Sequence, residues 1–452
     1  MRRMSNNNNQ GGSLGLWTCV AMIAGGMIGS SIFSLSGLTM TSAGPAAIIA
    51  WAIAAAIMLC YGLVCAELST RFPKSGGVFV FPSKALGKTE EQGRLWGWIS
   101  TWGYINANIV AIAFAAIYVG TYLSVGFPIF GKLQIPLAIG SIILILVLNS
   151  MKFALAGKVN NLLVLGLALT MIAYVVIAFV SGAWDGSTLV PFFTQGSGGS
   201  TGFLAMVPTA MTGYGSIVAM AFMVSEVKNP NKNVPKSVLI AMIIVLALYL
   251  SIILATVGMV SAEFLMENPG MQFIPLYAAA FTKLAAIPWV SKLISIAALL
   301  ALLTTMLTVM SLTSRAIQAA AEKGLMPEGL AKNNKAGVPF NAALLVTIPC
   351  IVIACFPQFT ATIVSFGALF AAMTISINIV SLLVARKKFA LPEGAFHAPG
   401  GNVLPVVALA LIIICYIPDI IGGGWMIWAY SIAWYVIGII YYKVRQNKHK
   451  AD

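Results

Sequence analysis

Two glycine-rich stretches, each in the middle of a membrane-length apolar segment, decide the fold of this chain. The first is 25-GGMIGSSI-32 and the second is 213-GYGS-216. A continuous helix uses its own N–H and C=O groups, whereas an interrupted helix leaves several of them without partners. At bilayer depth such groups are tolerated only where protein or a water-filled cavity surrounds them. Paired interruptions in corresponding segments therefore predict the substrate site of a secondary transporter.

The composition is that of an integral membrane protein. Of the 452 residues, 60% are hydrophobic and only 8% are charged, and the mean hydropathy of +0.94 is far above that of soluble domains. About twelve apolar stretches are long enough, or nearly so, to cross a bilayer core of roughly 30 Å as helices. Their apolarity is continuous rather than alternating, which favours helices over a β-barrel. The stretches are residues 14–38, 44–68, 95–124, 134–150, 158–182, 203–226, 236–260, 289–313, 340–356, 359–385, 402–421 and 424–443.

Lysine and arginine are distributed unequally between the two sides of the membrane. The chain has 26 of them against 12 acidic residues, for a net charge of +14. With the N-terminus inside, only Lys132, Lys283 and Lys292 fall in outer loops, and the other 23 fall in inner loops or tails. The positive-inside rule therefore places both termini in the cytoplasm and supports the count of twelve. The same distribution argues against nucleic acid as a partner.

The interruptions fall in the first and sixth stretches, so a repeat would be five spans long. Because five is odd, the second repeat enters the membrane from the opposite side and forms an inverted repeat. The predicted organisation is a cytoplasmic N-terminal tail (1–13), a transport core (14–385) with repeats 14–182 and 203–385, two further helices (386–443) and a cytoplasmic tail (444–452).

No residue pattern supports covalent catalysis, a metal site or a cofactor site. No histidine and no pair of carboxylates lies within the apolar stretches, and the six cysteines show no metal-binding spacing. We therefore expect a protein that is not an enzyme and that holds neither metal nor cofactor. Glu67 and Glu226 lie at the cytoplasmic ends of the second and sixth stretches. Glu226 is either a gate residue, paired with a basic residue between the second and third stretches, or a solvated helix end.

The ends of interrupted helices carry opposite partial charges. An α-carboxylate suits the positive N-terminal end of a half-helix, and an α-ammonium suits the negative C-terminal end. A zwitterion therefore matches both ends of such a gap. Gly25 and Gly29 also form a small-xxx-small pattern, for which helix packing is the alternative explanation. The second interruption at the matching place favours a binding site.

Six motifs occur in order along the chain. They are 29–33 (GSSIF), 66–68 (AEL) with 71–77 (RFPKSGG), 225–230 (SEVKNP), Arg315 with 322–327 (EKGLMP), 337–339 (GVP) and 396–401 (FHAPGG). Through them the chain resembles, over essentially all of its length, the amino acid–polyamine–organocation (APC) permease superfamily. The resemblance implies an all-α membrane protein with the LeuT-like five-plus-five fold, discontinuous first and sixth helices, and transport of amino acids or amines by alternating access.

The resemblance also implies roles for residues at the interruptions. The amides of Ser30 and Ser31 would bind the carboxylate, and the carbonyls of Met27 and around Gly213 would accept hydrogen bonds from the ammonium. Ser31 stands where the family usually has glycine, which narrows the cavity or offers a hydroxyl. The predicted substrate-binding residues are Met27, Gly29, Ser30, Ser31, Ile32, Asn108, Thr212, Gly213, Tyr214 and Gly215.

Two family features are replaced in this chain. The bulky aromatic residue often found shortly before the Tyr214 position is Met211 or Thr212 here. Tyr214 is thus the candidate closing aromatic of the outer gate; alternatively it is a core tyrosine with a bonded hydroxyl. The lysine that some branches carry in the fifth stretch would fall at Gly166 or Leu167. Proton coupling through that lysine is not supported, and exchange or coupling by another route remains open.

Other polar side chains within the stretches are expected mainly to link helices, through hydrogen bonds worth roughly 0.6 kcal/mol each. One or two of them would touch substrate, and Thr304 and Thr305 leave a sodium site as a further alternative. These residues are Asn106, Asn108, Thr304, Thr305, Thr308, Ser365, Thr374, Ser376 and Asn378.

No carboxylate lies at midplane depth, where an uncompensated cation is costly. We therefore predict a small, neutral amino acid as the substrate of a multi-pass transporter in the cytoplasmic membrane. The alternative is a basic amino acid or polyamine held by carbonyls and by the aromatic faces of Trp98, Trp102 and Tyr104. A channel or sensor on the same scaffold is less favoured, because the polar residues are clustered rather than continuous.

Overall fold

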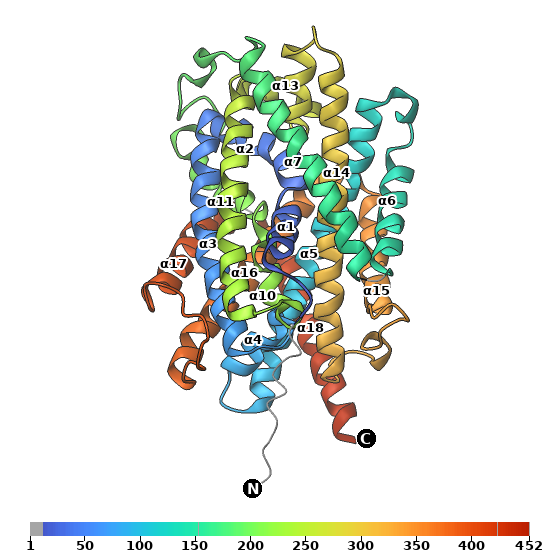
Figure 1. Ribbon diagram of the computed structural model, residues 1–452, viewed down its shortest axis with the longest axis vertical. Helices are drawn as coiled ribbons and strands as arrows, with labels where there is room; N and C mark the ends of the chain where they lie inside the picture. The colour runs from blue at the N-terminus through green and yellow to red at the C-terminus, as the bar shows by residue number, and fades with distance from the viewer. Residues whose placement is uncertain (1–11, 152, 423, 452) are drawn as a thin grey trace.

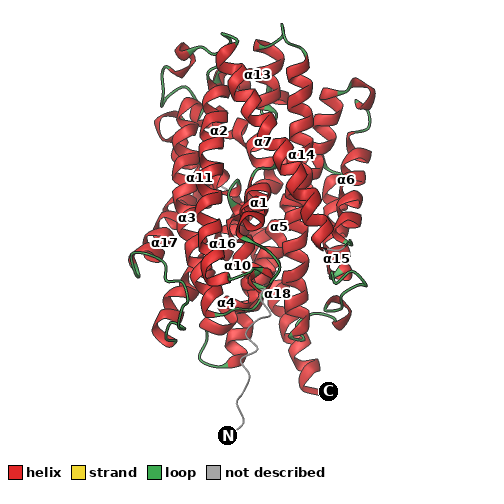
Figure 2. Ribbon diagram, in the orientation of Figure 1, coloured by secondary structure: helices red, strands yellow, loops and turns green. Residues whose placement is uncertain are grey.

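The computed structural model describes residues 12–151, 153–422 and 424–451, which form helices and their connections (Figures 1 and 2). Among these residues, the isolated parallel bridge between Leu14 and Val227 is the one β-type pairing. The α-helices are α1 (Leu16–Met27), α2 (Ser36–Ala43), α3 (Ala47–Arg71), α4 (Gly77–Ala85), α5 (Glu90–Gly126), α6 (Gln134–Asn149), α7 (Phe153–Val180), α8 (Gly202–Ala205), α9 (Val207–Thr212), α10 (Ala219–Phe222), α11 (Pro230–Val257), α12 (Ala262–Glu267), α13 (Pro275–Lys283), α14 (Trp289–Glu322), α15 (Phe340–Ala354), α16 (Thr360–Lys388), α17 (Val403–Gly422) and α18 (Gly424–Ala451). Short 3-10 turns at Gly44–Ala46, Pro128–Phe130, Gly186–Leu189, Gly199–Thr201, Pro269–Met271, Glu328–Leu330 and Pro357–Phe359 join some of them.

The helices of the described chain match the apolar stretches of the sequence. Seven helical segments are long and apolar enough to cross a membrane, or eight if the bent pair Gly199–Thr212 and Gly215–Phe222 counts as one. One of the seven, Leu16–Arg71, is 56 residues long and contains both of the first two stretches. The fourth, ninth and eleventh stretches form shorter apolar helices, α6, α15 and the first part of α17.

Both glycine-rich stretches interrupt their helices. α1 ends at Met27, and the chain resumes as a short π-helix, η1 (Ser31–Leu35), which leads into α2. In the second stretch α9 ends at Thr212, the 3-10 turn η6 (Gly215–Val218) follows, and the two parts are bent by 46°. Glycine destabilises helix because it loses the most backbone freedom on folding, so the local sequence accounts for both interruptions.

The longest helix, α5, is the centre of the helix packing. It contacts α14, α16, α4, α6 and α15, and small buried residues such as Gly97, Ala113 and Ala116 let these neighbours approach closely. On the other side, α3 and α11 pack against each other and against η6, while α1 contacts both α11 and α14. The interrupted helices therefore lie between the α3–α11 pair and the α5–α14 pair.

Tryptophans attach α18 to α5. The rings of Trp102 and Trp434 stack with centroids 4.8 Å apart, and each indole N–H donates to the other residue's backbone carbonyl, at 2.8 and 3.1 Å. Trp98 is 1% exposed and donates to the carbonyl of Gly438 at 2.7 Å. Trp98 and Trp102 thus face α18, and the idea that they offer aromatic faces to a cationic substrate is wrong.

The connections predicted for opposite sides of the membrane lie at opposite ends of the molecule. α4, from the loop predicted to be cytoplasmic, and the end of α18 lie at the lower end in Figure 1, while α13, from a loop predicted to be external, lies at the upper end.

A buried carboxylate group ties the lower end of α3 to α16. Glu67 is fully buried, and its oxygens lie 2.8 Å from the guanidinium of Arg71 and 2.5 Å from that of Arg386. It also accepts a hydrogen bond from the backbone N–H of Ala398 at 2.8 Å. Two motifs that are distant in the sequence, around residues 67 and 397, therefore meet at one ion cluster.

Candidate substrate site

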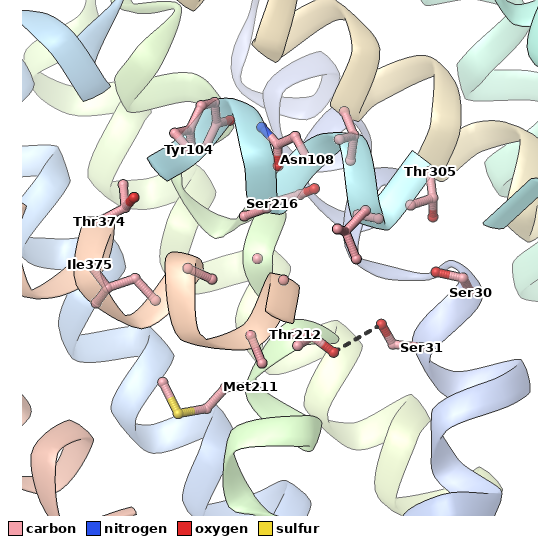
Figure 3. A pocket seen from close by; sticks show the side chains of 18 of the residues that line it. Ser30, Ser31, Tyr104, Asn108, Met211, Thr212, Ser216, Thr305, Thr374 and Ile375 are labelled. Carbon is pink, nitrogen blue, oxygen red and sulfur yellow. Dashed lines mark hydrogen bonds between the residues drawn. The ribbon is translucent and has the colours of Figure 1, made fainter. Parts of the chain in front are cut away.

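A cavity of about 160 Å³ lies beside the two interruptions (Figure 3). The residues that enclose it come from α1, η1, α3, α5, α9, η6, α14, α16 and α17. Most of its lining side chains are apolar, and within the described chain no Asp, Glu, Lys, Arg or His lines it. The polar side chains that line it are Ser30, Ser31, Tyr61, Tyr104, Asn108, Thr212, Ser216, Thr305, Thr374 and Tyr416. Such a lining has hydrogen-bonding groups for orientation and no counter-charge for an ionised substrate side chain.

The structure brings most of the predicted site residues together. The ones that line the cavity are Met27, Ser30, Ser31, Asn108, Thr212 and Gly215. The others, Gly29, Ile32, Gly213 and Tyr214, do not line it, and the Ile32 and Tyr214 side chains are fully buried behind it.

A pair of hydroxyls joins the two interruptions across the cavity. The Oγ of Ser31 lies 3.5 Å from the Oγ1 of Thr212 (Figure 3). Ser31 begins η1 and Thr212 ends α9, so the N-terminal end of one half-helix and the C-terminal end of another meet at this wall. These ends carry partial positive and partial negative charge, respectively.

The glycines of the first stretch serve packing as well as the cavity. A Cβ added at Gly29 would lie 1.5 Å from the Oγ1 of Thr305 on α14, which leaves no space for a side chain. A Cβ added at Gly26, which lines the cavity, would lie 2.6 Å from the Oγ of Ser216. Close helix packing and access to the cavity thus both require small residues here.

The carbonyl groups predicted to receive an ammonium face a tyrosine hydroxyl. Tyr249 of α11 donates a hydrogen bond to the carbonyl of Met27, and its hydroxyl lies 3.3 Å from the carbonyl oxygen of Gly213. These carbonyls belong to different interrupted helices and converge on one point. No motif in the sequence singles out Tyr249, which lies in a plain apolar helix.

Tyr214, the candidate gate aromatic, is part of a cluster of rings. Its hydroxyl donates to the carbonyl of Trp51 at 3.2 Å, and its ring centroid lies 6.0 Å from that of Trp51 and 5.3 Å from that of Tyr249. In this conformation Tyr214 is therefore a core residue with a bonded hydroxyl, and its ring does not close the cavity.

Some lining residues were not among the predicted substrate-binding residues. Tyr104, named from the sequence only as an aromatic face for a cationic substrate, lies one helical turn before Asn108 on α5. Ser216, which directly follows the GYG of the second interruption, was not assigned to the site. Within the described chain, the Nδ2 of Asn108 and the Oγ1 of Thr305 are buried without a hydrogen-bond partner. Unsatisfied buried polar atoms are costly, so a polar ligand in the cavity would satisfy them. The four-residue spacing of Tyr104 and Asn108, which places both on one face of a helix, was the sequence signal that could have assigned Tyr104 to the site.

Glu226 contacts two distant segments of the chain, α14 and the residues just before α1. Glu226 ion-pairs with Arg315 of α14 rather than with a basic residue between α3 and α5, so the expected partner was wrong. Nearby, the backbone N–H of Gly76 donates to the carbonyl of Phe222 at 2.8 Å. At the isolated bridge between Leu14 and Val227, the backbone N–H of Leu14 donates to the carbonyl of Glu226 at 3.0 Å. Helix α14 supplies the partner because its last turns, which contain Arg315, lie beside Glu226. The separation of the two residues in the sequence gives no sign of this proximity.

The ion pair at Glu226 is partly buried. Its two side chains are 21% and 19% exposed. Burial raises the pKa of Glu226 above its ordinary value, and the charge of Arg315 opposes that rise. The loss of solvation therefore offsets part of the attraction between the two charges.

Comparison with known proteins gives the family. The model of the family described as amino acid permease matches residues 14–441. The chain belongs to this family of APC permeases. The branched-chain amino acid permease BcaP of Lactococcus lactis is 27% identical to this permease, over 95% of this chain and 94% of the relative. BcaP of Bacillus subtilis is 26% identical over 96% and 93%, and the methylthioribose transporter of the same species is 26% identical over 94% and 91%.

The family and the apolar helices together make this permease a multi-pass protein of the cell membrane. Its similar relatives are transporters and not enzymes. The resemblance seen in the six sequence motifs is thus confirmed.

Proposed function

We propose that this permease is a secondary transporter that moves small, neutral amino acids across the cytoplasmic membrane by alternating access. The observation that carries the proposal is the uncharged cavity beside two interrupted helices. The amides that begin η1, at Ser30 and Ser31, bind the carboxylate of the substrate. The carbonyls at the ends of α1 and α9 receive its ammonium.

The lining of the cavity favours an uncharged, apolar substrate side chain. Apolar residues such as Met58, Phe114, Val309 and Ile375 surround the hydroxyl and amide groups. A cationic side chain would be buried there without a counter-charge, which is costly. The relatives named branched-chain amino acid permeases support the same class. A basic amino acid or polyamine is the second candidate, for which Tyr104 supplies an aromatic face.

The proposed architecture has twelve spans, two inverted five-span repeats at 14–182 and 203–385, and both termini in the cytoplasm. It is supported by the interruptions in the first and sixth stretches and by the separation of α4 from α13 in Figure 1. Since Gly166 and Leu167 occupy the place of the family's lysine, proton coupling through that lysine is not part of the proposal. Exchange and coupling by another route are the two alternatives.

Counterflow in proteoliposomes tests the function. Vesicles are loaded with unlabelled valine, and entry of radiolabelled valine is followed with and without a pH gradient. A carrier shows faster entry when substrate is present inside, whereas a channel or a sensor does not. Lysine and putrescine, offered in the same preparation, test the cationic alternative. Absence of trans-stimulation by every amino acid and amine offered would reject the proposal.

Glu226→Gln should open the cytoplasmic side of the permease. An ion pair of this kind is worth roughly 1 kcal/mol, so its loss shifts a two-state equilibrium about fivefold. A cysteine introduced at Ala371, which lines the cavity, reports on access from the cytoplasm to a membrane-impermeant thiol reagent. We expect faster labelling in Glu226→Gln.

Glu322→Gln is the matched control, because it neutralises an exposed carboxylate at the end of α14. Its labelling rate should equal that of the parent. Labelling of the native cysteines is measured in the protein without the reporter and subtracted. If Glu226→Gln also labels at the parental rate, the gate role is refuted.

A further inference from the structure

We propose, on the basis of the function proposed above, that Tyr416 of α17 is a specificity-determining residue, whose ring limits the length of the substrate side chain. Tyr416 lines the cavity, and within the described chain it is the one residue of α17 that does so. Helix α17 lies outside both of the predicted five-span repeats. A helix beyond the proposed transport core therefore contributes to the wall of the substrate site.

One face of α17 is turned toward the other helices. Ala408, Ile412 and Tyr416 follow one another at four-residue intervals and are 0%, 2% and 3% exposed. Ile413 and Ile417, on other faces of the helix, are 53% and 44% exposed. Residues four apart share a helix face, and this face packs against α3 and α16. The position of the Tyr416 ring is thus determined by helix packing.

Tyr416 lies on the side of the cavity that α3 and α16 form. Met58 of α3 and Ile375 of α16 line the same cavity, and α17 packs against both of these helices. Ser30 and Ser31, the proposed carboxylate subsite, lie at the other side of the cavity from Ile375 (Figure 3). A substrate held by its charged groups at the interruptions therefore directs its side chain toward α16 and α17.

The ring of Tyr416 is the rigid part of this wall. Methionine side chains such as Met58 and Met211 are flexible and adapt to apolar groups of different shape. A buried tyrosine ring on a packed helix has no comparable freedom, and close-packed interiors tolerate little added volume. A short apolar side chain therefore fits between the interruptions and Tyr416, whereas a longer one meets the ring.

Tyr416→Ala tests this limit, because it removes the ring. The full-length permease is reconstituted, and phenylalanine is compared with valine as a competitor of labelled valine entry. The ratio of the half-inhibitory concentration of phenylalanine to that of valine measures the penalty on a longer side chain. We expect this ratio to fall about tenfold in Tyr416→Ala, within the range by which apolar pockets discriminate side chains of different size.

Tyr416→Leu gives a second measure and replaces Tyr416→Ala if that variant loses its fold by size-exclusion chromatography. Leucine keeps an apolar group on the packed face of α17, so the ratio should fall in the same direction but by less. The shift in the midpoint of thermal unfolding that each amino acid produces in detergent supplies the ratio where a variant transports too slowly.

Ile412→Ala is the matched control. Ile412 lies one helical turn before Tyr416 on the same face and is 2% exposed, but it does not line the cavity. Its truncation removes a buried side chain from α17 in the same way. A general loosening of α17 would change the ratio in both variants, whereas the proposal expects Ile412→Ala to keep the wild-type ratio.

The outcomes separate the two proposals. If the wild-type protein shows no counterflow with any neutral amino acid, the proposed function fails, and this inference fails with it. If the wild type carries valine and a folded Tyr416 variant keeps the wild-type ratio of phenylalanine to valine, the role of Tyr416 alone is overturned. An equal fall in Tyr416→Ala and Ile412→Ala would also overturn it.

Discussion

Ser31→Trp is expected to abolish amino acid uptake while the protein still folds and reaches the membrane. Ser31 lines the cavity opposite Thr212, and its Oγ lies 3.5 Å from the Oγ1 of Thr212. An indole at this position would occupy the space of about 160 Å³ that the substrate needs. Because the cavity accommodates part of the added volume, the cost to stability should stay near the ~1–3 kcal/mol of an overpacked core. Uptake and counterflow of labelled valine in proteoliposomes measure the loss.

Ala56→Trp is the control for the added indole. Ala56 is exposed on α3, away from the cavity, so this variant should transport as the wild type does. Expression, membrane insertion and the size-exclusion profile are compared for both variants. Normal uptake by a correctly folded Ser31→Trp protein would contradict the proposed pocket.

Glu67→Ala is expected to have the largest effect on stability. Glu67 is fully buried, and it neutralises Arg71 and Arg386, whose side chains are only 4% and 8% exposed. Its removal leaves two buried cations without a counter-charge and the backbone N–H of Ala398 without its acceptor. Breaking a buried ion pair in this way costs about 3–5 kcal/mol. The midpoint of thermal unfolding in detergent should fall by many degrees, and the yield of folded protein should fall with it.

Glu328→Ala serves as the comparison, since Glu328 is exposed in a connection after α14. Such a surface change usually alters the free energy of unfolding by less than ~0.5 kcal/mol. Glu67→Gln should be intermediate, because the amide oxygen still accepts a hydrogen bond while the charge is lost. An unfolding midpoint for Glu67→Ala equal to that of the wild type would show that the cluster does not hold α3 to α16.

The local features of the fold were predictable because they depend on neighbouring residues. Continuous apolar stretches form helices wherever they are long enough, and the GGMIGSSI and GYGS segments interrupt them because glycine disfavours helix. The uncharged nature of the cavity followed from the absence of carboxylates at midplane depth.

The pairings between distant residues were not predictable in the same way. The sequence predicted that Glu226 pairs with a basic residue between the second and third stretches, but its partner is Arg315 on α14. Trp98 and Trp102 were predicted to bind a cationic substrate through their aromatic faces, but they pack on α18. Tyr249 gave no signal, because a tyrosine in an apolar helix looks the same whether its hydroxyl meets one carbonyl or two.

The sequence alone predicted a helical membrane protein with two helices interrupted at matching places. This was possible because helix formation and membrane insertion depend on composition within some 20 residues. The tertiary structure decided what surrounds those interruptions. The hydroxyls of Ser31 and Thr212 meet, α11 places a tyrosine hydroxyl beside two carbonyls, and α14 supplies the ion-pair partner of Glu226. These contacts depend on how whole helices rotate and cross. That choice is made by side-chain packing over the entire bundle, so no single segment contains it.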